Sequence, residues 1–255
     1  MPTNRLQSIS TIRSNVLGTT LCIALLMAVV AAAQPASPMA VQVDISKLLN
    51  ARVVITQRDG HLQLVDTNGL DFGHSILLTK TAAEVAGAGK LTPLPDSDLF
   101  AANDRHPEVK LHYAQAGGGP QVYRSAQKTA TNTIPVPQQN YRQMQLFFIS
   151  AAGPTPISVK LQYVDGSSDL RTTRVPDFYY LPKAGDQGWF VLVDDFGKVD
   201  HQGKMTEAAH HYIHGFDLNP DPGKVLQEIE IIKENSGSVL NLFGITGTPA
   251  EPKGH

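Results

Sequence analysis

Cysteine is almost absent from this 255-residue chain. Its one cysteine, Cys22, lies inside an apolar run near the N-terminus, so the chain beyond that run has no thiol and no disulfide. This excludes a disulfide scaffold, a zinc site with cysteine ligands and a cysteine nucleophile. A domain without disulfides must be held together by its hydrophobic core.

Clusters of positive charge are missing as well. The formal net charge is -2, and no basic stripe of the kind that contacts a phosphate backbone is present. We therefore expect no nucleic-acid partner. No second long apolar run follows Ala33, and no basic amphipathic helix is recognisable, so we expect no contact with a membrane beyond export.

Sequence motifs of several enzyme classes are also absent. There is no Gly-x-Ser-x-Gly elbow, no recognisable pair of glycosidase acids and no phosphate-binding Gly-Lys-Thr loop. A polysaccharide lyase would need a Tyr or His base with an Arg, Gln or Asn beside it. Residues of these types are present, but their spacing singles out none of them: His112, Tyr113, Arg142, Gln145 and Tyr163. The sequence thus leans towards a protein that is not an enzyme.

The N-terminus has the pattern of a secretory leader. Arg5 and Arg13 precede an apolar run from Leu21 to Ala33, which ends in three alanines and is too short to span a bilayer. We predict a signal peptide over residues 1–33 and a periplasmic or extracellular location. Residues 34–40, with two prolines, are expected to form a flexible lead-in, and residues 249–255 a disordered tail.

The pattern of residues 41–248 predicts one domain made of short strands. Apolar and polar residues alternate with a period of two, and turn pairs such as Asp59-Gly60 and Asp165-Gly166 separate the segments. This pattern favours an all-β, jelly-roll-like antiparallel sandwich. Short helices are expected at 46–49 and 81–86, and strands at 52–57, 61–65, 75–79, 108–114, 142–150, 157–163, 170–174, 188–194, 211–218, 225–233 and 239–246.

Several segments, taken in order, resemble the galactose-binding-like β-sandwich of secreted bacterial carbohydrate-active proteins. They are Val43–Ser46 with Asn50, Gly69–Ser75, Tyr141–Ser150, Val159–Ser167, Val175–Phe178, Tyr212–Leu218 and Val239–Thr246. The resemblance implies a galactose-binding-like fold and a glycan as partner. The chain departs from the family pattern at Phe178, where Trp is expected, and at Phe72-Gly73-His74, so a ligand groove formed there in relatives would be altered here.

A sugar-binding surface needs an aromatic platform with polar partners, because a pyranose has one apolar face and a rim of hydroxyls. The segment Phe178-Tyr179-Tyr180 is rich in aromatics, and we select Tyr179, with Arg174 and Asp177, as the candidate surface. If the segment is a strand, Phe178 and Tyr180 point one way and Tyr179 the other. Trp189 is expected in the core, since tryptophan is highly buried on average.

Histidines and carboxylates are the remaining candidates for metal ligands in this chain. His210, His211 and His214 lie in a segment predicted to be a strand, which excludes a zinc pair within it, so we expect hydrogen-bonded histidines there. Asp165 with Asp194 and Asp195 could supply oxygen ligands to a structural calcium, although Asp165-Gly166 is also a standard hairpin turn, the reading we favour. No other cofactor is expected.

The sequence as a whole favours a secreted, non-catalytic β-sandwich that binds carbohydrate. Two alternatives stay open: a stand-alone polysaccharide lyase or glycoside hydrolase on a jelly-roll fold, and an envelope protein with a structural or protein-interaction role.

Overall fold

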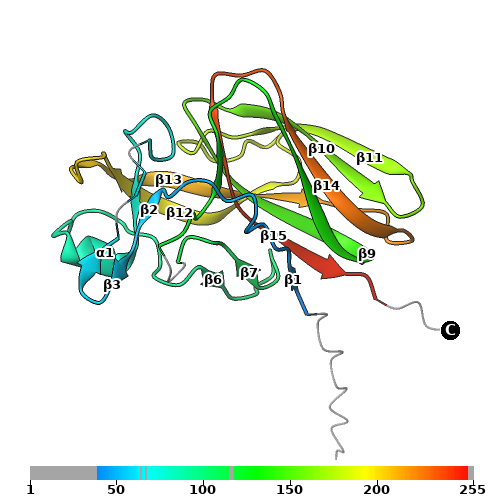
Figure 1. Ribbon diagram of the computed structural model, residues 1–255, viewed down its shortest axis with the longest axis horizontal. Helices are drawn as coiled ribbons and strands as arrows, with labels where there is room; N and C mark the ends of the chain where they lie inside the picture. Colours follow the sequence, from blue (N-terminus) through cyan, green and yellow to red (C-terminus); the bar gives the residue numbers. More distant parts are fainter. Residues whose placement is uncertain (1–38, 64, 67, 115–117, 252–255) are drawn as a thin grey trace, which may run out of the picture. The chain divides into compact units, whose positions relative to one another are not determined.

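One long strand is shared by two antiparallel sheets. The computed structural model describes residues 39–63, 65–66, 68–114 and 118–251. Strand β9 (Ala130–Ala151) pairs through its first half with β14 (Val225–Lys233), and through its second half with β13 (Met205–Leu218) and β15 (Val239–Pro249). The strand therefore leads from one sheet into the other (Figure 1).

Each sheet has a simple order. In the first, which we name the β10 sheet, the order is β9, β14, β10 (Thr155–Tyr163) and β11 (Ser168–Val175). In the second, the β15 sheet, it is β12 (Trp189–Val199), β13, β9 and β15. Two short strands, β1 (Val41–Gln42) and β8 (Tyr123–Ser125), pair with β15 at its outer edge.

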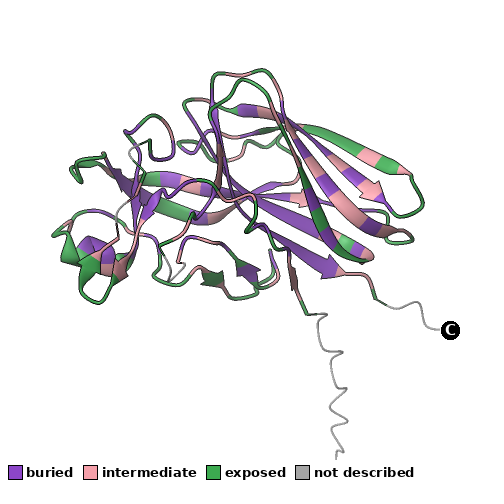
Figure 2. Cartoon of the chain, viewed as in Figure 1, coloured by how far each residue is buried: buried purple, intermediate pink, exposed green. Residues whose placement is uncertain are grey.

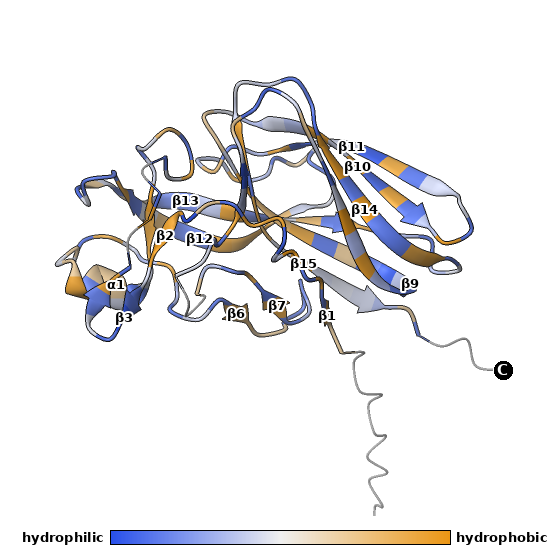
Figure 3. Cartoon of the chain, viewed as in Figure 1, coloured by the Kyte–Doolittle hydropathy of each residue, from blue (hydrophilic) through white to orange (hydrophobic). Residues whose placement is uncertain are grey.

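The two sheets enclose a hydrophobic core. Hydrophobic and hydrophilic residues alternate along β10 and β14 (Figure 3). The hydrophobic residues of these strands pack against alternate residues of β9 and β15 from the other sheet. The facing side chains include Ile157, Val159, Leu161, Ile229 and Ile231 on one side and Leu146, Phe148, Leu240 and Leu242 on the other. This arrangement confirms the predicted all-β sandwich, and Trp189 lies in its core as expected.

The outer face of the β15 sheet is also covered. Residues between 51 and 122 pack over it, and a second core forms there around Phe147 and Ile149 of β9 and Phe243 of β15. Both faces of these strands are therefore buried (Figure 2). The continuous apolar run in the second half of β9 follows from this, because neither face of the strand meets water.

The covering segment contains only short elements. They are β2 (Val54–Ile55), β3 (Gln57–Arg58), β4 (His61–Leu62), β5 (Leu77–Leu78), α1 (Lys80–Val85), β6 (Leu99–Phe100) and β7 (Val109–Lys110). The strands predicted here were too long, and β2 pairs with β5 in parallel. The predicted helix at 81–86 is confirmed by α1, but residues 46–48 form a turn and not a helix.

The first half of β9 was missed because of its prolines. Pro135 and Pro137 lie within the strand and cannot donate to a ladder hydrogen bond. This half of β9 is the edge of the β10 sheet and pairs on one side only, with β14. Prolines are tolerated at such an edge, so the segment is a strand and not an irregular connection.

The predicted signal peptide, most of the lead-in and most of the tail lie outside the described residues. All the residues that the structure describes belong to one compact unit. In this part of the chain, no helix is long and apolar enough to cross a membrane.

His214 of β13 is buried in the sandwich as a neutral ring. Its Nε2 atom lies 2.9 Å from the backbone oxygen of Tyr180, and its ring meets Trp189 edge to face. Since the carbonyl can only accept, Nε2 carries the proton. Burial lowers the pKa of His214 to about 4, because a charged ring would be poorly solvated there.

The low pKa of His214 makes folding sensitive to acid. Between about pH 6.5 and pH 4 the unfolded chain binds a proton at this histidine and the folded chain does not, so stability falls as the pH falls through this window. The full effect is about 3 kcal/mol. We expect the free energy of unfolding, measured with urea at about pH 7 and pH 4.5, to fall by about 2 kcal/mol less in His214→Gln than in the parent chain. Equal losses in the two proteins would contradict this account.

Candidate functional site

Tyr179 stands in a turn and faces solvent. The segment 178–180 is not a strand: Phe178 is buried, whereas Tyr179 and Tyr180 are 39% and 65% exposed. The expected alternation, with Tyr180 on the side of Phe178, is therefore wrong, because a turn does not impose the two-residue period. The exposure of Tyr179 agrees with its selection as a surface residue.

Asp177 holds this turn in place from within the protein. It is 5% exposed, and its carboxylate accepts hydrogen bonds from the backbone N–H of Tyr179 at 3.0 Å and of Gly153 at 2.6 Å. Phe178 packs into the outer core and its ring stacks on His211, 4.8 Å between centroids. Asp177 thus orients the Tyr179 turn, and its carboxylate is occupied by the backbone.

A buried lysine lies directly beneath the Tyr179 hydroxyl. Lys198 of β12 is 6% exposed, and its Nζ donates to the Tyr179 hydroxyl at 2.6 Å and to Ser75 Oγ at 3.2 Å. The same Nζ lies 3.1 Å from Glu207 Oε1 on β13. The three donors of the ammonium group therefore have three partners, which is what burial of a charge requires.

Glu207 is the second charged group, after Lys198, that bonds to the Tyr179 hydroxyl. The Tyr179 hydroxyl donates to Glu207 Oε1 at 2.7 Å. Burial raises the pKa of Glu207, but the hydrogen bonds from Tyr179 and Lys198 outweigh this and leave the pKa below its ordinary value. Burial lowers the pKa of Lys198, but the hydrogen bonds to Tyr179 and Glu207 raise it by more, so the pKa lies above its ordinary value. The lysine and the carboxylate therefore form a charged pair with the phenol between them.

His211 lies behind Glu207 and is fully buried. Its Nδ1 is 2.8 Å from the backbone oxygen of Phe196 and must donate to it. Its Nε2 is 3.4 Å from Glu207 Oε2 and has no hydrogen bond among the described residues. Burial lowers the pKa of His211, which favours the neutral ring. We name Ser75, Tyr179, Lys198, Glu207 and His211 the Tyr179 cluster.

The glycine-containing segment 69–75 delivers Ser75 to the cluster. Asp71 accepts hydrogen bonds from the backbone N–H of Phe72 and His74 and from the Ser75 hydroxyl. Gly69 has a φ of 52°, and a Cβ there would lie 2.5 Å from the backbone oxygen of Ser75. The loop therefore requires glycine at this position, and its closure fixes Ser75 against Lys198.

Exposed aromatic rings gather on the segments that meet at Lys198. Among the described residues, the well-exposed aromatic side chains are Phe72, Tyr179 and Tyr180. Phe72 belongs to the segment that holds Ser75, while Tyr179 and Tyr180 belong to the turn that Asp177 orients. The rings offer apolar surface, and the part-exposed carboxylate of Glu207 offers acceptor oxygens, whereas the buried Lys198 ammonium has all its donors engaged within the protein.

Arg174 is not part of this arrangement. It is exposed on β11, where it pairs across the ladder with Pro156 of β10. The contacts of Tyr179 within the described part of the chain do not include it. Of the three residues selected from the sequence, Tyr179 is thus a surface group, Asp177 supports it and Arg174 lies on another element.

The carboxylates considered for calcium serve local structure. Asp165 accepts bonds from the backbone N–H and the hydroxyl of Ser167 in the β10–β11 turn, and these bonds lower its pKa. Asp194 and Asp195 lie on β12. The Asp195 carboxylate contacts the ring and accepts a hydrogen bond from the backbone N–H of His210 on β13, and both residues have a positive φ. Over residues 39–63, 65–66, 68–114 and 118–251, no three His, Asp, Glu or Cys side chains gather to hold a metal. The calcium site stays a prediction.

The residues considered for a lyase do not form one site. Tyr113 donates to the backbone oxygens of Pro95 and Ser97, and the hydroxyl of Tyr163 donates to Asp169. Gln145 donates to Asp217. Burial raises the pKa of Tyr163 to about 12. Tyr113, Gln145 and Tyr163 are thus buried and hydrogen-bonded within the structure, whereas His112 is partly buried and Arg142 is exposed.

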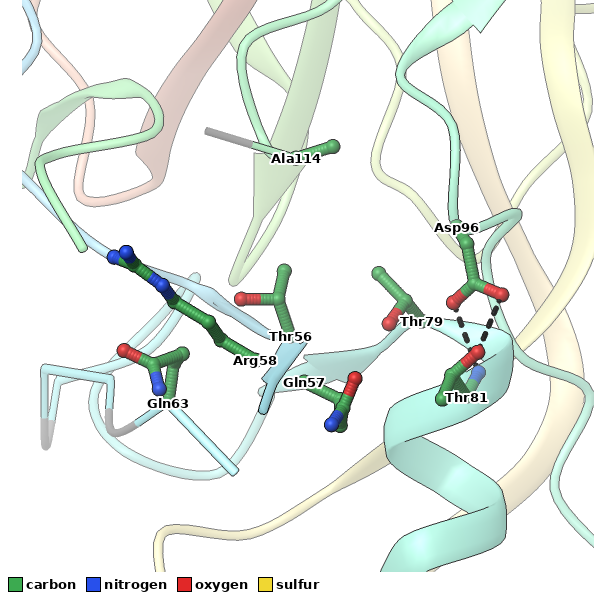
Figure 4. A pocket seen from close by; sticks show the side chains of 8 residues that line it. All are labelled: Thr56, Gln57, Arg58, Gln63, Thr79, Thr81, Asp96 and Ala114. Atoms are coloured by element: carbon green, nitrogen blue, oxygen red, sulfur yellow. Dashed lines mark hydrogen bonds between the residues drawn. The ribbon is translucent and has the colours of Figure 1, made fainter. Parts of the chain in front are cut away.

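A cavity of about 270 Å³ lies beside α1 (Figure 4). Asp96 in its wall is bound through both oxygens to the backbone N–H and hydroxyl of Thr81, so it secures the start of the helix. Its other lining groups are Thr56, Gln57, Arg58, Gln63, Thr79 and Ala114.

A larger cleft of about 540 Å³ runs along β11 and is lined by Arg171, Asp186 and Asp217, among others. Neither cavity places an exposed aromatic ring against a charged pair, as the Tyr179 cluster does.

Sequence reasoning missed Lys198 and Glu207 altogether. It named Ser75 and His211, the latter as a hydrogen-bonded histidine, but did not join them to Tyr179. The predicted strands 188–194 and 211–218 are both shorter than β12 and β13. The hairpin that pairs Lys198 with Glu207 was therefore not predicted. The turn residues Asp200 to Lys204, with Gly203 at a φ of 78°, were the available signal.

Comparisons with known proteins add little to this geometry. No protein-family model matches the chain, and no curated protein matches it. Among solved structures, the chain is similar to the catalytic unit of a thermostable GH87 alpha-1,3-glucanase from Streptomyces thermodiastaticus strain HF3-3, at 13% identity and a TM-score of 0.28. The match covers 52% of this chain and 22% of the glucanase unit. A likeness of this size carries no information about function.

Proposed function

We propose that this chain is a secreted carbohydrate-binding protein and that the Tyr179 cluster is its binding surface. Within this proposal, the resemblance to galactose-binding-like jelly rolls indicates the family, and the leader-like N-terminus indicates work in the periplasm or outside the cell. The observation that carries the proposal is Tyr179 itself. Its side chain is 39% exposed, and its hydroxyl is bonded to both Lys198 and Glu207.

The chemistry of a sugar suits this surface. The C–H face of a pyranose packs on an aromatic ring, while its hydroxyls need donors and acceptors in fixed positions. Glu207 has a side chain that is 41% exposed and supplies acceptor oxygens, and Tyr179 supplies the ring. Because the side chains are already held by one another, little conformational entropy is lost when a ligand binds.

Removal of the Tyr179 ring should abolish binding. We expect Tyr179→Ala to weaken retention on an immobilised polysaccharide by about tenfold or more, because stacking and two hydrogen-bonded partners are lost together. The measurement is a pull-down of the mature protein with a panel of insoluble and gelled polysaccharides. Leu170→Ala, which removes an exposed side chain on β11, is the control and should bind like the parent. Unchanged retention of Tyr179→Ala would refute this surface.

Lys198 is expected to serve binding more than folding. In Lys198→Met the aliphatic length is kept, the cost of burying an ammonium disappears, and water can replace it at the half-exposed Tyr179 and Glu207. We expect the free energy of unfolding to change by less than about 1 kcal/mol and retention to fall about tenfold.

A second buried lysine provides the matched control for Lys198. Lys233 of β14 is 1% exposed and donates to the backbone oxygen of Gln127, away from the cluster. Lys233→Met should leave retention unchanged. If Lys198→Met instead unfolds the protein by several kcal/mol and binds normally once folded, Lys198 is a structural residue.

A further inference from the structure

Strand β11 is a free edge of the β10 sheet. It pairs with β10 on one side only and stands last in the strand order (Figure 1). Along residues 168–175, no backbone hydrogen bond runs to any other segment of the described chain. About half of the backbone N–H and C=O groups of this strand therefore point away from the sheet, where a further strand can pair with them.

The other edges of the two sheets are protected. The first half of β9 carries Pro135 and Pro137, which cannot donate to a new ladder. The outer edge of β15 is occupied by β1 and β8, and β12 is partly covered where Val199 bonds to Ile76. Strand β11 contains no proline, and no element in the described part of the chain pairs with its outer edge.

The free edge carries charges of both signs and one apolar side chain. Leu170 is 60% exposed and points away from the core. Asp169 and Arg171 lie on the opposite face of the strand from Leu170, because they are paired with the core residues Leu161 and Val159 of β10. Arg171 is exposed and has no ion pair within the part of the chain that the structure describes.

A second copy of β11 can pair with this edge in only a few registers. A two-fold axis perpendicular to the sheet turns the strand antiparallel to itself, so that one central residue faces its own copy. With Asp169 or Arg171 at the axis, like charges face each other, which is unfavourable. With Thr172 at the axis, Leu170 faces Arg174, and no opposite charges meet.

With Leu170 at the axis, the two strands are complementary. Leu170 packs on Leu170 of the second copy, and Asp169 faces Arg171 of that copy on both sides of the axis. Residues 168–172 of the two copies then pair. Charges on an edge strand ordinarily keep other strands away, but in this register the alternation of sign makes them attractive.

We propose that β11 is a dimerisation edge, at which two copies of this chain join their β10 sheets into one antiparallel sheet centred on Leu170. The occupant is a second copy because the complementarity is that of the strand with itself. The interface is small, so we expect a weak dimer, with a dissociation constant of about 100 µM. A pull-down at about 1 µM then contains monomers, in which Leu170→Ala remains a valid control.

The lack of cysteine allows a direct test of the register. The chain beyond Cys22 has no thiol, so a cysteine introduced into the mature protein can form a disulfide only with a second copy. In Leu170→Cys, the two Cα atoms would lie about 5 Å apart at the axis, within disulfide range. In Thr172→Cys, the matched control on the same face of the strand, they would lie about 13 Å apart along the strands.

We expect mild oxidation at about 100 µM to link Leu170→Cys into dimers at least about tenfold faster than Thr172→Cys. Sedimentation equilibrium of the parent between about 10 and 500 µM should show the mean mass rising towards twice that of the monomer. Arg171→Asp places carboxylates opposite carboxylates and should raise the dissociation constant at least about tenfold. Arg174→Asp makes the same change of charge where no charge faces it, and should match the parent.

The alternative results are equally clear. A monomeric mass of the parent over the whole range would overturn the proposal. Equal linking of the two cysteine variants, or faster linking of Thr172→Cys, would also overturn it, because either result requires a different contact. So would equal dissociation constants for Arg171→Asp and Arg174→Asp. All four positions are exposed, so the variants should fold, and none of these results bears on the retention of polysaccharide.

Discussion

The burial of the β15 sheet on both faces is the constraint on which the structure depends. Its inner face packs on the β10 sheet and its outer face on residues 51–122, so that Phe147 and Phe148 lie in two different cores. The chain beyond Cys22 has no cysteine to join these layers, and apolar contact must hold them. The Tyr179 cluster is assembled on the outer layer, where the segments bearing Ser75 and Tyr179 meet the β12–β13 hairpin.

Much of the fold follows from the sequence where strands are long and alternate. The segments at 157–163 and 225–233 were placed within a residue or two, because apolar side chains at every second position face one core. The prediction of strands failed where alternation of apolar and polar residues does not decide the structure. Pro135 and Pro137 concealed an edge strand, and the covering layer around Val54 and Leu77 is held by packing, with ladders only two residues long.

The candidate site was predictable only in part. Tyr179 was found because aromatic residues are dense around it, but its partners come from segments about 100 residues earlier and 20 to 30 later in the chain. Lys198 and His211 look like ordinary strand residues in the sequence. Their role depends on the register of β12 against β13, which places Lys198 opposite Glu207, and on the bulge where Asp195 and His210 have positive φ.

Hydrogen–deuterium exchange with and without a retained oligosaccharide tests most directly whether the Tyr179 cluster is where the ligand binds. The account predicts that protection on binding is concentrated in residues 69–75, 177–181 and 198–211, the three segments that meet at Lys198. Protection confined to residues 155–175 of the β10–β11 hairpin, with none in those three segments, would contradict it.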